Sequence, residues 1–193
     1  MITLQTMINL YKGVLMDFEL LFLDAIQSIR FGLLDSIMLL ATHVGDGGLI
    51  WIILSLALLV HKKTRKIGLA CALALVCSLV ITNLGLKNII GRARPYNYRD
   101  LILLIPTPKD FSFPSGHTSA AFSVVYVLLR EKFKVKGVRV DYIALVLAVL
   151  MAFSRMYLYV HFPTDIIASL FIAYICARLG IYLSETIYHK IKK

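Results

Sequence analysis

Long apolar runs alternate with short charged stretches along this chain of 193 residues. The clearest run, Ile67–Leu86, has no charged residue, and a helix needs about 20 mostly apolar residues to cross the hydrocarbon core of a membrane. Together with the shorter runs named below, it predicts an all-α integral membrane bundle of six transmembrane helices. The five shorter runs, which would extend into their polar flanks, are Ile29–Val44, Gly48–Val60, Thr118–Leu129, Tyr142–Phe153 and Ile166–Ala177.

Residues 1–28 are amphipathic, with Phe18, Leu21, Phe22 and Ala25 on one face. This pattern predicts an N-terminal helix that lies in the membrane interface, and an additional span there is the alternative. The first residues alternate polar and apolar without a small-residue cleavage site, so we expect no cleavable signal peptide. We therefore predict a single domain over residues 1–193, with the interfacial helix at 1–28 and the six-span bundle at 29–186.

The composition supports a membrane protein. The chain is 59% hydrophobic and 17% charged, with a mean hydropathy of +0.79, whereas soluble domains are nearer half apolar and a quarter charged. The formal net charge of +10 would suggest nucleic acid in a soluble protein, but here the cations cluster between apolar runs. The positive-inside rule explains that clustering, so we expect the lipid bilayer and no nucleic acid as a partner. Cys71, Cys77 and Cys176 lie within apolar runs without metal-ligand spacing, which favours packing over a disulfide.

Three groups of cations alternate with the six predicted spans so that all would lie on one side. The positive-inside rule assigns that side, with both termini, to the cytoplasm of a multi-pass plasma-membrane protein. Residues 45–48, 91–113 and 155–165 would then face outward. The outer loop nevertheless carries cations of its own, which suggests that they bind an anion. The inner groups are Lys62, Lys63, Arg65 and Lys66; Arg130, Lys132, Lys134, Lys136 and Arg139; and Lys190, Lys192 and Lys193; the outer cations are Arg92, Arg94, Arg99 and Lys109.

Three short polar motifs fall at the outward edges of the apolar runs, between residues 87 and 165. Charged residues in such places are costly and usually functional. The motifs are Lys87 followed after six residues by Arg94-Pro95; Pro114-Ser115-Gly116-His117; and Ser154-Arg155, five residues, His161, three residues and Asp165.

The third motif has the components of a histidine nucleophile. Pro163 suits the first position of a helix, which would place Asp165 in its first turn, within reach of His161. A carboxylate that binds one imidazole nitrogen raises the basicity of the other. Taken singly, Asp165 could be a charge favoured by the helix dipole and His161 an interfacial histidine. Their pairing beside Ser154-Arg155 favours a catalytic role.

The other two motifs can hold a phosphate. Ser115 is a good N-cap, and free N–H groups at a helix N-terminus bind phosphate, which Gly116 would allow to approach closely. His117 would act as general acid and then as general base. Lys87, with Arg94 and Arg155, could stabilise charge on a transferring phosphoryl group. Simple capping by Ser115 and snorkelling of Lys87 to the surface are the alternatives.

These motifs resemble the signature of the type 2 phosphatidic acid phosphatase superfamily, which also includes soluble vanadium haloperoxidases, at all eleven signature positions. The resemblance implies that His161 attacks phosphorus to form a phosphohistidine, that Asp165 orients it, and that His117 protonates the leaving group. It also implies that catalysis needs no metal or other cofactor. The implied phosphate ligands are Lys87, Arg94, Ser115, Gly116 and Arg155. Ser154, Pro114 and Pro95 would lie next to these ligands, in a second layer around the phosphate.

The resemblance implies a membrane lipid phosphatase, similar to bacterial undecaprenyl-diphosphatases and phosphatidylglycerophosphatase B. We expect undecaprenyl diphosphate as substrate, with phosphatidylglycerophosphate, phosphatidic acid or a lipid A phosphate as alternatives. Tyr96, Tyr98, Arg99 and the rest of the Asn97–Lys109 loop would set the choice. A non-catalytic lipid-phosphate binding or translocating protein would need neither histidine, and the hydrophobicity disfavours a haloperoxidase. The sequence does not indicate an oligomeric state.

Overall fold

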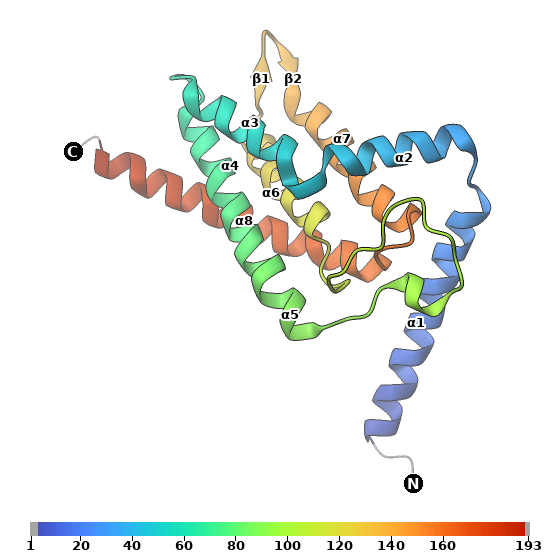
Figure 1. Ribbon diagram of the computed structural model, residues 1–193. Coiled ribbons are helices and arrows are strands. Elements are labelled where there is room, and N and C mark those ends of the chain that lie inside the picture. Colours follow the sequence, from blue (N-terminus) through green and yellow to red (C-terminus); the bar gives the residue numbers. More distant parts are fainter. Residues whose placement is uncertain (1–3, 192–193) are drawn as a thin grey trace.

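The computed structural model describes residues 4–191, and the side chains of residues 13–190. The chain is mostly helical, with one short hairpin (Figure 1). A π-helical segment, Leu79–Leu86, joins α4 to α5, and 3₁₀ turns lie at Asp46–Gly48 and Pro95–Tyr98. The elements are α1 (Leu4–Ser28), α2 (Gly32–Val44), α3 (Leu49–Val60), α4 (Arg65–Ser78), α5 (Lys87–Ile90), α6 (Gly116–Arg130), β1 (Lys134–Val135), β2 (Val138–Arg139), α7 (Val140–Tyr157) and α8 (Pro163–Ile191).

The core is built around α6, which packs against α4, α7 and α8. Four of its residues, Val124, Val125, Val127 and Leu128, are fully buried although they point in different directions from the helix axis. A helix that is apolar on all sides is stable only when other elements surround it. The central position of α6 therefore fixes its first turn, which carries the second polar motif, in the interior of the bundle.

Fewer helices could cross a membrane than the six predicted. Among the described residues, three helical stretches are long and apolar enough: Arg65–Tyr98, Val140–Tyr157 and Pro163–Lys190. The pair α2 and α3 would make a fourth only if the two count as one span. Helix α6, which contains the predicted span Thr118–Leu129, has only 15 residues. The helical membrane architecture agrees with the prediction, and the count of six is not confirmed.

The junction of α2 and α3 differs from the predicted outward loop between two separate spans. The two helices meet at 43°, so the chain bends without folding back, as Figure 1 shows. Gly47 and Gly48 have φ angles of 62° and 72°, a region that glycine adopts at no steric cost. These glycines allow a tight 3₁₀ turn in place of a reversal. The prediction of two separate spans here is not confirmed, because the bend also allows α2 and α3 to form one bent pass.

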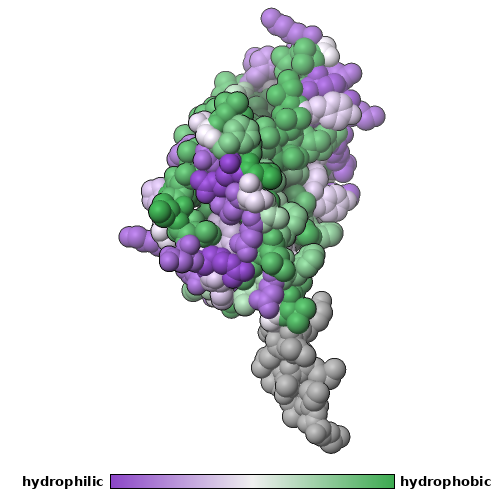
Figure 2. Space-filling view, turned by 90° about the vertical axis from the view of Figure 1, so that its right-hand side faces the viewer, coloured by the Kyte–Doolittle hydropathy of each residue, from purple (hydrophilic) through white to green (hydrophobic). Residues whose placement is uncertain are grey.

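Helix α1 has two apolar faces. Leu20, Leu23 and Ile26 are buried against the chain that links α7 to α8. The other face, which we predicted to lie in the membrane interface, is not covered by protein: Phe18 is 69% exposed and Leu21 63%. Figure 2 shows large apolar areas on this side of the molecule, with hydrophilic side chains gathered in patches beside them. One face of α1 therefore packs against the rest of the protein, and the exposed apolar face is suited to a non-aqueous environment.

Candidate active site

The three motifs meet around one cavity of about 750 Å³. Lys87, Arg94, His117, Arg155 and His161 all line it. These residues come from α5, the following loop, α6, α7 and the link between α7 and α8. The bundle thus brings together the cations and both histidines that the sequence analysis selected.

Lys87 reaches the cavity directly after the π-helical segment. The wider turns of a π-helix change which side of the following helix faces inward, and such segments are frequent at functional sites. The segment is tied to α6 by buried hydroxyls, because Ser119 Oγ lies 2.7 Å from Ser78 Oγ and 3.0 Å from Thr82 Oγ1. The Lys87 side chain is only 7% exposed, which excludes the alternative that it snorkels to the surface.

The second motif forms the start of α6. Ser115 caps the helix: its Oγ accepts hydrogen bonds from Thr118 N at 3.4 Å and Thr118 Oγ1 at 3.0 Å. Capping, the alternative interpretation of Ser115, is therefore present. A Cβ on Gly116 would lie 2.7 Å from Asn83 Oδ1, so a larger residue would require the Asn83 side chain to move. Pro114 is buried directly before the cap.

The third motif places His161 and Asp165 side by side in the interior. His161 Nδ1 lies 3.5 Å from Asp165 Oδ2, an ion-pair distance rather than an ordinary hydrogen bond. Their side chains are 2% and 0% exposed. Asp165 Oδ2 also accepts hydrogen bonds from Ser112 Oγ and from Phe162 N at 2.9 Å. These donors compensate the burial of the carboxylate and fix its direction.

The surroundings of His161 favour the neutral imidazole. Burial lowers the pKa of His161 to about 3, although Asp165 acts in the opposite direction. Arg94 Nη1 lies 3.3 Å from His161 Nε2, which assigns Nε2 as an acceptor and the ring proton to Nδ1, facing Asp165. Arg94 Nη1 also donates to Val160 O at 2.7 Å and is thereby held in place. A neutral imidazole with its Nε2 lone pair facing outward to a cation can act as a nucleophile.

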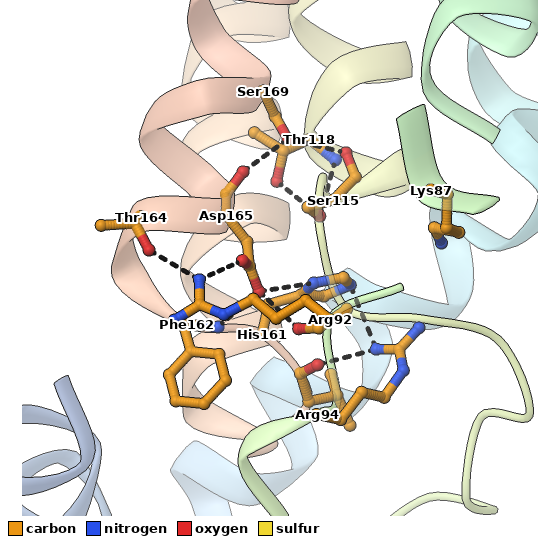
Figure 3. Close-up of polar contacts among 12 residues, drawn as sticks. Lys87, Arg92, Arg94, Ser115, Thr118, His161, Phe162, Thr164, Asp165 and Ser169 are labelled. Carbon is orange, nitrogen blue, oxygen red and sulfur yellow. Dashed lines mark hydrogen bonds and ion pairs between the residues drawn. The ribbon is translucent and has the colours of Figure 1, made fainter. Parts of the chain in front are cut away.

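Arg92, which we predicted to bind an external anion, is instead paired within the protein. Its Nη1 donates to Asp165 Oδ1 at 2.6 Å and to Thr164 Oγ1 at 2.7 Å, and its Nη2 donates to Glu19 Oε2 at 2.6 Å. Figure 3 shows the guanidinium beside Thr164 and Asp165. Its carbon lies 3.9 Å from the centre of the Phe162 ring.

Glu19 anchors this network from α1. Its side chain is 3% exposed and accepts hydrogen bonds from Thr164 N at 3.0 Å and Thr164 Oγ1 at 2.6 Å. The sequence analysis missed Glu19, because only the fold brings α1 beside the start of α8. Arg99, also predicted among the anion-binding cations, pairs with Asp24 of α1 at 3.1 Å in the same way.

Asp110 is another residue that the sequence analysis did not select. Its carboxylate contacts Lys87 Nζ through one oxygen and accepts a hydrogen bond from Arg94 Nη2 at 2.6 Å through the other. Partial burial opposes ionisation, but Lys87 and Arg94 hold the pKa of Asp110 at about 2. A carboxylate thus occupies the two cations that we predicted to hold phosphate oxygens.

Arg155 is the third cation of the cavity. Its Nη1 contacts the Thr42 hydroxyl, whereas its Nε has no partner among the described residues although it is buried. A buried donor without an acceptor is costly, so an anion in the cavity would stabilise this arrangement. Ser154 Oγ donates to Met151 O at 2.7 Å within α7, and Pro95 is buried directly after Arg94.

His117 has a carboxylate partner of its own. Its Nε2 lies 3.0 Å from Asp46 Oδ1, in the 3₁₀ turn between α2 and α3. Asp46 was not selected from the sequence, because its distance from His117 along the chain gives no signal of contact.

Within the described part of the chain, no three His, Cys, Asp or Glu side chains are grouped so that they could hold a metal ion.

The family model described as the PAP2 superfamily matches residues 63–188. An undecaprenyl-diphosphatase of Sulfolobus acidocaldarius is 31% identical over 71% of this chain and 65% of its own length, so the chain spans slightly less than two thirds of that relative. Undecaprenyl-diphosphatase BcrC of Bacillus subtilis is 29% identical over 79% of this chain and 76% of its own. The crystal structure of a transmembrane PAP2-type phosphatidylglycerolphosphate phosphatase from Bacillus subtilis superposes with a TM-score of 0.68 and 29% identity, covering 93% of this chain and 89% of that one. All three relatives are named as phosphatases.

Proposed function

Because this chain belongs to the PAP2 superfamily, we propose that it is a membrane lipid phosphatase that acts through a phosphohistidine on His161, with undecaprenyl diphosphate as its substrate. The observation that carries the proposal is one cavity lined by three cations and by a buried, neutral His161. Phosphate binding alone would need the cations, but it would not need a histidine held by Asp165. Transfer of the phosphoryl group to that histidine would use both the cations and the histidine paired with Asp165.

The first half of the reaction transfers the phosphoryl group to the protein. Lys87, Arg94 and Arg155 would bind its oxygens, displacing the Asp110 carboxylate. Nε2 of His161 would attack phosphorus as the bond to the bridging oxygen breaks, and the leaving oxygen would take its proton from His117. The charge on the transferring group is stabilised by the cations and by the N–H groups at the start of α6.

The second half releases phosphate. His117, now neutral, would remove a proton from water, whose oxygen attacks phosphorus as the P–N bond breaks. His161 returns to the neutral form with its Nδ1 proton facing Asp165. Each histidine thus ends in its starting state, and the sum is the hydrolysis of one phosphate ester or anhydride bond.

The shape of the cavity supports a lipid as the leaving group. Beyond the charged end, its walls include Ile52 and Leu56 of α3, Leu75 and Val76 of α4, and Leu79. Apolar walls of this kind suit a hydrocarbon chain. The two relatives named as undecaprenyl-diphosphatases favour a prenyl diphosphate. The structural neighbour named for phosphatidylglycerolphosphate supports that lipid as the alternative.

The membrane arrangement follows from the charges and from the bend. We place the cavity on the extracytoplasmic face of the plasma membrane and the C-terminus in the cytoplasm, where the cationic groups between α3 and α4 and around the hairpin would lie. With α2 and α3 taken as one pass, residues before Gly32 would lie on the outer side, which is the alternative to the predicted cytoplasmic N-terminus. Contacts of Glu19 with Thr164 and of Asp24 with Tyr159 support an interfacial α1 beside the cavity.

Cysteine labelling tests this topology. In a background without Cys71, Cys77 and Cys176, a cysteine at Asn97 or Asp17 should react with an impermeant reagent in intact cells. A cysteine at Lys63 should react only after permeabilisation. Labelling of position 17 only after permeabilisation would restore the six-span arrangement, and the same result at position 97 would invert the placement of the cavity.

The activity is tested by phosphate release from undecaprenyl diphosphate and phosphatidylglycerophosphate, side by side, with the detergent-purified protein and excess EDTA. We expect release from the prenyl diphosphate at the higher kcat/KM. A preference for the glycerophosphate lipid would change the substrate and keep the chemistry. Loss of activity in EDTA that magnesium restores would contradict the metal-free mechanism, and release from neither lipid would favour the non-catalytic binding protein.

A further inference from the structure

The turn between α2 and α3 lies close to His117. A Cβ on Gly45 would lie 3.1 Å from His117 Cδ2 and 2.4 Å from Met151 Sδ, so no larger residue fits there without movement. Gly47 and Gly48 follow with positive φ angles. Asp46, the one residue of this four-residue turn that is not glycine, places its Oδ1 3.0 Å from His117 Nε2.

The turn itself does not need the Asp46 carboxylate. The side chain caps neither the 3₁₀ turn nor α3, and among the described residues its one hydrogen-bond partner is His117. An aspartate often stabilises a turn by bonding to the backbone of its own segment. Here it points instead across the cavity wall to another helix, which indicates a role beyond the local backbone.

The charges around His117 give that role a physical reason. Burial lowers the pKa of His117, Arg155 of α7 and Lys87 of α5 lower it further, and the Asp46 carboxylate acts in the opposite direction. A general acid must carry its proton before it can donate it, and burial and nearby cations disfavour an imidazolium. Asp46 offsets part of this effect and can hold the ring by accepting from Nε2–H, which leaves Nδ1–H for the leaving oxygen.

We propose that Asp46 is the positioning residue of the general acid, so that the site contains a second histidine–aspartate pair in addition to His161 and Asp165. The inference rests on the proposed phosphatase function. In the transfer step the proton moves from His117 Nδ1 to the bridging oxygen, which keeps the electron pair of the broken P–O bond. Asp46 remains ionised throughout and retains the Nε2 proton of His117 in its hydrogen bond.

The first test is a double-mutant cycle on the lipid phosphate that the wild-type protein hydrolyses. Asp46→Asn keeps the shape and an acceptor oxygen but removes the charge, and we expect kcat to fall about 10- to 100-fold, within the range of general acid catalysis. Asp46→Ala should lose more, and Asp46→Glu should recover part of the loss. In the His117→Ala background, Asp46→Asn should have no further effect. Asp100→Asn, an exposed carboxylate outside the cavity lining, serves as the matched control.

The second test compares leaving groups. A good leaving group such as p-nitrophenolate needs little protonation, whereas an alkoxide needs a general acid. With dioctanoyl phosphatidic acid and p-nitrophenyl phosphate as substrates, Asp46→Asn should reduce kcat for the alkyl ester at least tenfold more than for the aryl ester. His117→Ala should show the same preference.

Three results would overturn the inference: equal losses on both substrates, a further loss in the His117→Ala background, or wild-type rates in both Asp46→Asn and Asp46→Ala. Equal losses would make Asp46 a structural residue of the turn. Each result is read against a wild-type protein that releases phosphate and a His117→Ala variant whose residual release is slow but measurable. A wild-type protein without phosphate release would instead overturn the proposed function itself.

Discussion

The two histidines of the cavity have opposite surroundings. His161 and Asp165 are 2% and 0% exposed, and Arg92, Ser112 and a backbone N–H hold the carboxylate. His117 and Asp46 are 20% and 57% exposed and have a single contact between them. A nucleophile gains from being fixed and kept neutral, whereas an acid and base must meet both a leaving group and water. The comparison indicates that solvent access and the number of contacts that fix each pair separate the two tasks.

The largest expected effect comes from exchanging each histidine for alanine. His161→Ala should lower kcat by about 10⁴-fold or more, because no other group can accept the phosphoryl group. His117→Ala should lower it about 10²- to 10⁴-fold and leave phosphoenzyme formation detectable. Phosphate release and rapid-quench labelling on matched preparations measure both. Equal residual activity in the two variants would remove the distinction between the buried and the exposed histidine.

Arg92→Lys tests the support of the buried pair. Lysine keeps the charge but lacks the planar fork that reaches Asp165, Thr164 and Glu19 together. We expect kcat to fall about tenfold with little change in KM, and the melting temperature to fall, because a buried carboxylate loses a donor. Arg99→Lys, at the exposed pair with Asp24, is the control and should remain near wild type. An unchanged kcat in Arg92→Lys would show that Asp165 needs no such support.

The dependence of stability on pH tests whether the fold keeps His161 neutral. Burial places the pKa of His161 at about 3, below its ordinary value of 6.5. Its unfolded form therefore binds more protons across this window, so the free energy of unfolding should fall as the pH is lowered from 6.5 towards 3. The melting temperature of the wild type should thus decline more steeply over this range than that of His161→Gln. Parallel declines would mean that His161 is not held neutral by the fold.

The smallest expected effect concerns Asp110. Its carboxylate occupies Lys87 and Arg94, and an incoming phosphate must displace it. Asp110→Asn should therefore lower the inhibition constant of inorganic phosphate or vanadate by about threefold, as expected for a partly exposed ion pair. Inhibition assays at two salt concentrations measure the change. A weaker inhibition in Asp110→Asn would instead make Asp110 part of the machinery that aligns the two cations.

The sequence predicted those contacts that depend on local spacing. His161 and Asp165 are one helical turn apart, so their proximity followed from the position of Pro163. The cap at Ser115 followed from its place before an apolar run. Asp46, Asp110 and Glu19 could not be selected in this way, because their partners lie far away along the chain. Arg92 appeared as a free cation because its carboxylates come from α1 and α8.

The number of spans was predicted less well, for two physical reasons. The bend between α2 and α3 depends on the positive φ angles of Gly47 and Gly48, which a hydropathy pattern does not register. Helix α6 has only 15 residues and is surrounded by other helices, so its apolar composition reflects burial in the bundle and does not by itself indicate a span. The burial of Lys87 likewise depends on the π-helical segment before it, for which the sequence carries no recognised signal.

The central claim is that His161, and not His117, carries the phosphoryl group. The most direct measurement is rapid acid-free quenching of the His117→Ala variant during turnover of the lipid phosphate, followed by mass spectrometry of its peptides. We expect a phosphate on His161 that accumulates because the water-activating base is absent, and none in His161→Ala. Phosphate on another residue, or turnover in His161→Ala at a rate near wild type, would contradict the account.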